Sequence, residues 1–244
     1  MAIKTVTASG KGGVGKSTVT RNLGLQLSEM GFRTLLIDCD AGLSSLDIML
    51  GVTEKVNFTW ADAAEERCSV KDALIKISDK LTLLPSPKTP LTEDFPDIIK
   101  SITDELGSEY DYIFIDAPAG IGRGLLRAAR GADKALVVAT ADEVSVSGAG
   151  TVSRVLRESG INESRLLINR YSVKAAKKGL LLTVDEIIDK TLVQLIGIIP
   201  EDKNIMYTTV STKKLKTKKS DSAFSRISGR IQGKNIPLEL SQLK

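Results

Sequence analysis

A glycine-rich stretch near the start of the chain constrains the fold more than any other feature. Residues 10–17 read Gly-Lys-Gly-Gly-Val-Gly-Lys-Ser, which matches the spacing GxxxxGK[ST], and they follow the apolar run Ile3–Ala8. Glycines allow consecutive backbone N–H groups to turn inward around an oxyanion, and a helix that follows adds the positive end of its dipole. The sequence therefore predicts a phosphate-binding loop, in which Lys16 reaches the β- and γ-phosphates of a nucleotide and the Ser17 hydroxyl binds Mg²⁺.

Short apolar runs alternate with amphipathic stretches along the rest of the chain. Several runs are almost continuous valine, isoleucine and leucine, which is typical of strands covered on both faces. Repeated units of strand and helix predict an α/β fold, with a doubly wound, mostly parallel sheet flanked by helices. The predicted strands are Ile3–Ala8, Arg33–Ile37, Leu81–Leu84, Tyr112–Ile115, Ala135–Ala139, Arg165–Ile168 and Leu195–Ile199.

No linker, low-complexity tract or repeat divides the chain, so we expect residues 1–244 to form one domain. Its carboxyl-terminal part differs in composition from the rest. Residues 213–219 form a basic loop, a helix is predicted from Asp221 to Gln232, and residues 239–244 form a short tail.

Three acidic residues stand at the ends of predicted strands. Asp116 ends the hydrophobic run from Tyr112, and Asp38 and Asp40 end the second strand. Ligands of parallel α/β sheets bind at the carboxyl ends of the strands, so these acids should lie beside the phosphate loop. We expect Asp116 to orient Mg²⁺ through water, and residues 117–120 to form a segment that senses the γ-phosphate.

Composition excludes several kinds of chemistry. The chain has no histidine, so no mechanism can use an imidazole base or an imidazole metal ligand. Its two cysteines, Cys39 and Cys68, form no CxxC pair and supply no cluster or zinc ligand set. The chain shows neither a signal-peptide pattern nor an apolar run long enough for a membrane span, which predicts a cytoplasmic protein.

The second lysine of the loop gives the chain a more specific resemblance. Residues 11–18, Lys-Gly-Gly-Val-Gly-Lys-Ser-Thr, resemble the deviant Walker A motif of the MinD/ParA family of P-loop ATPases. Residues 38–51 are similar to the switch I region of its MinD branch, the division-site positioning ATPases. The resemblance covers nearly the whole chain and also rests on Asp116–Ile121, Gly131–Ala135, Leu167–Tyr171, Val184–Ile187, Gly197–Asp202, Arg226–Ile231 and Ile236–Leu238.

The resemblance implies an ATP hydrolase that binds ATP with Mg²⁺ and closes as a homodimer. Lys11 would contact phosphate across the dimer interface, Asp40 would position the attacking water, and Asp38 would support the magnesium shell beside Ser17 and Asp116. Nucleotide contacts are implied for Gly10, Lys11, Gly12, Gly13, Val14, Gly15, Lys16, Ser17, Thr18, Asn169, Arg170, Pro200, Glu201 and Asp202.

Two stretches depart from the family pattern. The membrane-bound members carry an amphipathic helix beyond the position of Leu238, whereas only Glu239–Lys244 follow here, so we expect weak or no membrane binding. The second departure is a basic cluster that could attract DNA, an acidic protein or an anionic surface, or could serve solubility alone. It consists of Lys213, Lys214, Lys216, Lys218 and Lys219.

Three functions therefore remain open from the sequence. The first is a MinD-like switch that positions the division site or a related cargo, the second is a ParA-type ATPase associated with DNA, and the third is a nucleotide-binding scaffold without turnover. The third is disfavoured because Lys16, Ser17, Asp40 and Asp116 are all present. The residues identify neither the cargo nor the activating partner, and leave open association with membrane or nucleoid.

Overall fold

The computed structural model describes residues 1–89, 95–202, 204–205 and 218–238. Its central feature is an eight-stranded sheet with the strand order β3-β4-β2-β5-β1-β6-β7-β8, in which every described pairing is parallel except that of β3 with β4. The strands are β1 (Ile3–Ala8), β2 (Thr34–Asp38), β3 (Ile75–Lys76), β4 (Leu81–Leu84), β5 (Tyr112–Asp116), β6 (Lys134–Ala139), β7 (Glu163–Tyr171) and β8 (Leu195–Pro200).

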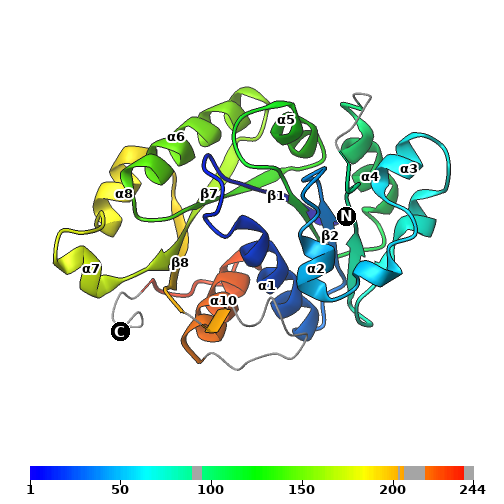
Figure 1. The fold of residues 1–244 in the computed structure, drawn as a ribbon. Coiled ribbons are helices and arrows are strands. Elements are labelled where there is room, and N and C mark those ends of the chain that lie inside the picture. Colours follow the sequence, from blue (N-terminus) through cyan, green and yellow to red (C-terminus); the bar gives the residue numbers. More distant parts are fainter. Residues whose placement is uncertain (90–94, 203, 206–217, 239–244) are drawn as a thin grey trace.

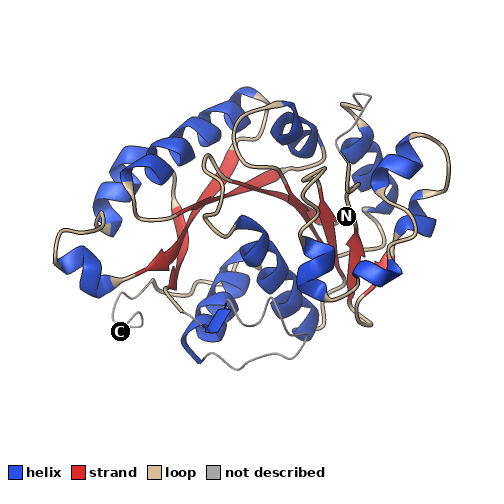
Figure 2. Cartoon of the chain, in the orientation of Figure 1, coloured by secondary structure: helices blue, strands red, loops and turns tan. Residues whose placement is uncertain are grey.

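Helices cover both faces of this sheet, as Figures 1 and 2 show. One face carries α1 (Lys16–Glu29), α2 (Leu46–Leu50) and α10 (Lys218–Ile231), which pack together through a core that contains Leu23 and Phe224. The opposite face and its ends carry the larger core. Its helices are α3 (Trp60–Ala64), α4 (Ile98–Leu106), α5 (Arg123–Arg130), α6 (Glu143–Glu158), α7 (Val173–Lys177) and α8 (Val184–Thr191). The predicted α/β fold, doubly wound and mostly parallel, is confirmed.

The apolar pattern of the sequence explains this arrangement. In α1, Val19, Leu23 and Leu27 are buried on one side, as their helical spacing predicts. The central strands β2 and β5 are buried along their whole length, because helices lie on both faces of the sheet. Two short 3₁₀ helices, Thr53–Lys55 and Val70–Ala73, connect the elements around α3. Within the described ranges, no helix has the length and apolarity that crossing a membrane requires.

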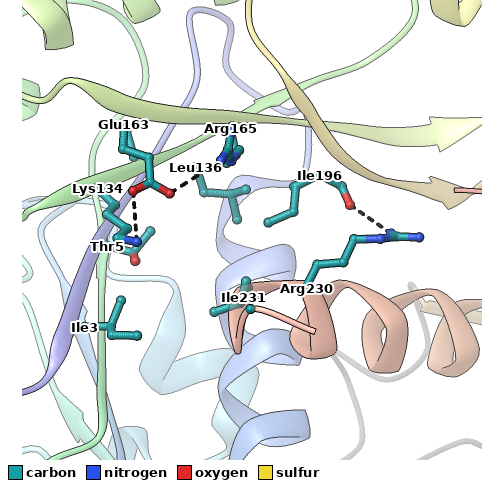
Figure 3. A pocket seen from close by; sticks show the side chains of 11 residues that line it. Ile3, Thr5, Lys134, Leu136, Glu163, Arg165, Ile196, Arg230 and Ile231 are labelled. Carbon is teal, nitrogen blue, oxygen red and sulfur yellow. Dashed lines mark hydrogen bonds and ion pairs between the residues drawn. The ribbon is translucent and has the colours of Figure 1, made fainter. Parts of the chain in front are cut away.

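A cavity of about 210 Å³ lies at the amino ends of β1, β6, β7 and β8 (Figure 3). Its polar groups are engaged with one another: Glu163 forms ion pairs with Lys134 and Arg165. Arg230 of α10 donates hydrogen bonds to the carbonyl oxygens of Ile196, Ile236 and Pro237. These contacts hold the end of α10 against the sheet, on the edge opposite the glycine-rich loop.

Candidate nucleotide site

The glycine-rich loop connects β1 to α1 at the carboxyl edge of the sheet. Gly13 and Gly15 have φ angles of 77° and 91°, a region that glycine enters without a steric penalty. Gly15 is the residue before α1, so the helix begins at Lys16 and directs its first free N–H groups toward the loop. Val14 is buried and anchors the loop, whereas Lys11, Gly12 and Gly13 are exposed. The loop thus presents backbone donors and the positive end of a helix to solvent.

A close backbone approach fixes the start of the loop. A Cβ atom added to Gly10 would lie 2.4 Å from the carbonyl carbon and oxygen of Gly148, which is within α6. A Cβ atom added to Gly15 would lie 2.4 Å from the side-chain nitrogen of Asn169. The loop therefore lies between α6 and the end of β7. At Gly10 the obstacle to a side chain is backbone, whereas at Gly15 it is the end of the Asn169 side chain.

Lys16 forms a buried ion pair with Asp116 at the end of β5. Its Nζ lies 2.8 Å from Asp116 Oδ1, and the two side chains are 7% and 0% exposed. The Thr20 hydroxyl donates to the same oxygen at 3.0 Å, while Asp116 Oδ2 is buried without a hydrogen-bond partner among the described residues. A buried carboxylate oxygen without a partner is costly, so this atom is available for a further donor.

Asp38 lies directly beside Asp116, since the two residues are paired in the register of β2 and β5. Its carboxylate accepts hydrogen bonds from the backbone N–H groups of Asp40, Ser45 and Leu46, at 3.0, 2.9 and 3.0 Å. Burial and the charge of Asp116 raise the pKa of Asp38 to about 6, against the opposing effect of these three donors. Asp38 thus holds the segment after β2 in place.

Asp40 is half-buried, and its carboxylate forms no hydrogen bond within the described residues. Burial raises its pKa, the charge of Lys16 lowers it, and the charge of Asp116 raises it. The structure therefore brings Asp40 within electrostatic reach of both members of the buried ion pair, with its own carboxylate uncommitted.

Lys11, the second lysine of the loop, is held in an exposed ion pair. Its Nζ lies 3.1 Å from Asp142 Oδ1. Asp142 also caps α6, because its side chain accepts hydrogen bonds from Ser145 N and Thr140 Oγ1. Burial acts to raise the pKa of Asp142, but the bonds from Thr140 and Ser145 and the contact with Lys11 outweigh it and lower the pKa.

The remaining predicted residues lie at differing places. Ser17 and Thr18 are in the first turn of α1, partly exposed. Asn169 donates to the carbonyl oxygen of Val14 at 2.8 Å and accepts from Arg170 N, so it contacts the loop. Pro200 ends β8, and Glu201 N donates to Tyr171 O.

Asp202 contacts the carboxyl-terminal helix α10. Its carboxylate accepts hydrogen bonds from Asn204 N and from the Ser220 hydroxyl of α10. The basic cluster is described only in part: Lys213, Lys214 and Lys216 lie outside the described residues, as does the tail 239–244, and the backbone of Lys218 and Lys219 begins α10.

Four further residues, none of them predicted, reach the site from distant positions. Thr20 donates a hydrogen bond to Asp116, and Asp142 forms an ion pair with Lys11. Gly148 lies against Gly10, and the indole of Trp60 donates to the backbone oxygen of Asp38. The spacing of Thr20, one turn after Lys16, could have indicated it, and Trp60 is the only tryptophan of the chain. Asp142 and Gly148 give no local signal.

The donors present fit magnesium bound together with a nucleotide. Among the described residues, no group of three or more acidic, cysteine or histidine side chains could hold a metal alone. Mg²⁺ usually keeps several waters and binds through one or two protein oxygens plus substrate phosphates. The uncommitted Oδ2 of Asp116, next to the Ser17 turn, meets this requirement.

Comparisons with known proteins agree with this geometry. The family model described as ParA, NUBPL iron-transfer P-loop NTPase, matches residues 2–234. The chain is 35% identical to the septum site-determining protein MinD of Bacillus subtilis over 243 residues, which cover 96% of this chain and 91% of that protein.

Solved structures give the same result. MinD in the MinC:MinD cell division protein complex of Aquifex aeolicus superposes with a TM-score of 0.90 at 33% identity, covering 98% of each chain. MinD of Pyrococcus horikoshii, solved with Mg-ADP, gives a TM-score of 0.85 at 27% identity, covering 95% of this chain and 96% of that one. The chain therefore belongs to the ParA/MinD family of P-loop NTPases.

Proposed function

We propose that the chain is a MinD-like ATPase that binds Mg-ATP, closes as a homodimer, hydrolyses ATP to ADP and phosphate, and acts as a spatial-positioning switch for the division site or a related cargo. One observation carries this proposal. Lys16, Asp38, Asp40 and Asp116 come from three separate elements and converge on one glycine-rich loop.

ATP binding follows from the loop. Lys16 is a buried cation that pairs, within the described part of the chain, with Asp116 alone. The phosphates of a nucleotide would offer it a stronger anionic partner beside the N–H groups of α1. Asn169 donates a hydrogen bond to Val14 O, and so holds the loop on the side where we place the sugar and the base of the nucleotide. Arg170 next to it, with Pro200, Glu201 and Asp202 after β8, is the proposed base side.

Ser17, Asp38 and Asp116 would hold Mg²⁺, directly or through water, and the ion would neutralise charge on the phosphates. Asp40 is the proposed positioner of the attacking water, because its carboxylate is near Lys16 and is not bound by another described group. The segment 117–120, whose Gly120 N donates to Ser9 O at 2.9 Å, follows Asp116 and is proposed to respond to the γ-phosphate.

Dimer closure is supported by the surface around the loop. Lys11 and its ion-pair partner Asp142 are both exposed at the surface beside the loop. Three apolar side chains follow the carboxyl ends of β2, β5 and β6 and are exposed to solvent: Leu43 by 75%, Ile121 by 52% and Val144 by 68%. A second copy that covered this edge would bury them, and would bring each Lys11 to the nucleotide of the partner. Because a relative was solved in complex with MinC, we propose that this dimer recruits a partner protein.

The test is release of phosphate from ATP by the purified chain, with and without Mg²⁺. We expect turnover that requires Mg²⁺, loss of ATP binding in Lys16→Ala, and retained binding without turnover in Asp40→Ala. Calorimetry separates binding from turnover. Equal ATP affinity in Lys16→Ala and the unmodified chain would contradict the proposed site, and unchanged turnover in Asp40→Ala would move the water-positioning role to another acid.

A further inference from the structure

Trp60, the first residue of α3, is fully buried between the end of β2 and α5. Its indole Nε1–H donates a hydrogen bond to the backbone carbonyl oxygen of Asp38 at 2.8 Å. A buried indole N–H needs an acceptor, and here the acceptor belongs to a strand end that carries two site acids. Trp60 is therefore a fully buried residue that contacts the backbone of the segment carrying Asp38 and Asp40.

The bond acts on a single peptide unit, the one between Asp38 and Cys39. The carbonyl oxygen of this unit, from Asp38, accepts the hydrogen bond of Trp60. The N–H group of the unit, from Cys39, donates to the backbone oxygen of Asp116 at 2.9 Å. The unit is thus fixed on both sides, at the point where β2 ends and its ladder stops. Since Asp38 precedes this unit and Asp40 follows one residue later, its orientation sets the direction of both carboxylates.

A second contact fixes the ring itself. The guanidinium carbon of Arg127 lies 5.6 Å from the centre of the Trp60 ring, and Arg127 is only 8% exposed. Arg127 belongs to α5, the helix that follows Asp116 and the segment 117–122. A cation over an indole face at this distance is attracted to it. The side chain of Trp60 therefore connects the end of β2, which carries Asp38, to α5, which follows Asp116 at the end of β5.

We propose that Trp60 is a positioning residue of the Mg-ATP site: by holding the Asp38–Cys39 peptide, it sets the orientation of Asp38 and Asp40. This inference rests on the proposed function, since it assigns a role only if the site binds Mg-ATP. It differs from a simple packing role in one respect. Packing requires the volume of the ring, whereas positioning requires its N–H group.

The sharpest experiment removes that group alone. Because the chain has a single tryptophan, incorporation of benzothienylalanine in place of tryptophan replaces the N–H of Trp60 by sulfur and changes no other residue. We expect the affinity for ATP without Mg²⁺ to stay within about twofold, because Lys16 and the loop are untouched. Turnover should fall about tenfold and the half-saturating Mg²⁺ concentration should rise several-fold, which is the effect of losing one buried hydrogen bond at the acids.

Trp60→Phe is the encoded counterpart and should show the same separation between ATP binding and Mg²⁺ response. Phe114→Leu is the matched control, because Phe114 is almost as deeply buried, belongs to the other core, and has a side chain without a hydrogen-bond donor. It should lower stability without shifting the Mg²⁺ dependence.

The outcomes separate the two proposals. An unmodified chain that neither binds nor hydrolyses Mg-ATP would contradict the proposed function. An unmodified chain that is active, together with a benzothienylalanine protein of unchanged Mg²⁺ dependence and turnover, would overturn the role of Trp60 alone. A shift of equal size in Phe114→Leu would also overturn it, since stability loss would then account for the effect.

Discussion

Asp38, an acid of the proposed site, lowers the stability of the folded chain at neutral pH. Its carboxylate is fully buried beside Asp116, and three backbone donors hold it in place. Burial and Asp116 raise its pKa from 3.8 to about 6. A folded-state pKa above the unfolded value means that the folded chain binds the proton more strongly between these two values. Asp38 therefore makes its full contribution to the free energy of unfolding below pH about 4, and this contribution is lost as the pH rises through about 6.

We predict that this loss, on the order of 2–3 kcal/mol, appears in the nucleotide-free protein as a pH-dependent difference from Asp38→Asn. The variant cannot titrate at this position, so carboxylates that do not interact with Asp38 cancel in the comparison. The difference that remains reports Asp38 together with its interaction with Asp116. Urea unfolding of both proteins at several pH values between 4 and 7 measures it. A difference in the free energy of unfolding that does not change with pH would show that Asp38 has an ordinary pKa.

Two elements, the loop and α6, meet at a glycine pair that sequence periodicity does not reveal. We predict that Gly10→Ala destabilises the chain by roughly 1–3 kcal/mol and weakens ATP binding at least tenfold, because the new Cβ would lie 2.4 Å from backbone atoms of Gly148 and must displace the loop. Urea unfolding and calorimetry measure the two effects. Gly12→Ala adds the same methyl group where no atom lies within 4 Å, and its nucleotide-free stability should equal that of the unmodified chain. Equal stability of Gly10→Ala would contradict the close contact.

At the level of elements, local pattern predicted much of the fold. The strands β1 and β4 have the predicted bounds, and the other five predicted strands differ by one to three residues at one or both ends. The last helix begins at Lys218, three residues before its predicted start. The two-residue strand β3 was not predicted, because it is too short to show alternation and depends on its pairing with β4.

The candidate site likewise has parts that could be predicted from the sequence and parts that could not. Its loop and acids are local signals, because a glycine-rich turn and an acid at a strand end are readable from neighbouring residues. The contacts of Lys11 with Asp142 and of Asp38 with Trp60 join positions that are 131 and 22 residues apart. Such contacts depend on strand order and helix placement, which spacing along the chain does not specify.

At the scale of the whole molecule, the question is what Lys11 does when a second copy is present. Its ion pair with Asp142 joins side chains that are 46% and 38% exposed. Exposed pairs of this kind contribute only about 0–1 kcal/mol, so the pair does not prevent Lys11 from reaching a phosphate. In the proposed site Lys16 serves the phosphates from within the subunit, which would leave Lys11 free to act across an interface.

We predict that Lys11→Ala binds ATP with nearly unchanged affinity but stays monomeric with Mg-ATP, whereas the unmodified chain dimerises. Asp142→Asn is the matched variant: asparagine still caps α6, the lysine remains, and its partner within the subunit is lost, so this variant should dimerise at least as readily. Both changes are made in an Asp40→Ala background to suppress turnover, and light scattering during size exclusion gives the mass. Dimerisation of Lys11→Ala at the same ATP and protein concentrations would exclude the trans role. In that case Lys11 would be a surface lysine of the loop, and formation of the dimer would have to depend on the exposed apolar side chains Leu43, Ile121 and Val144 alone.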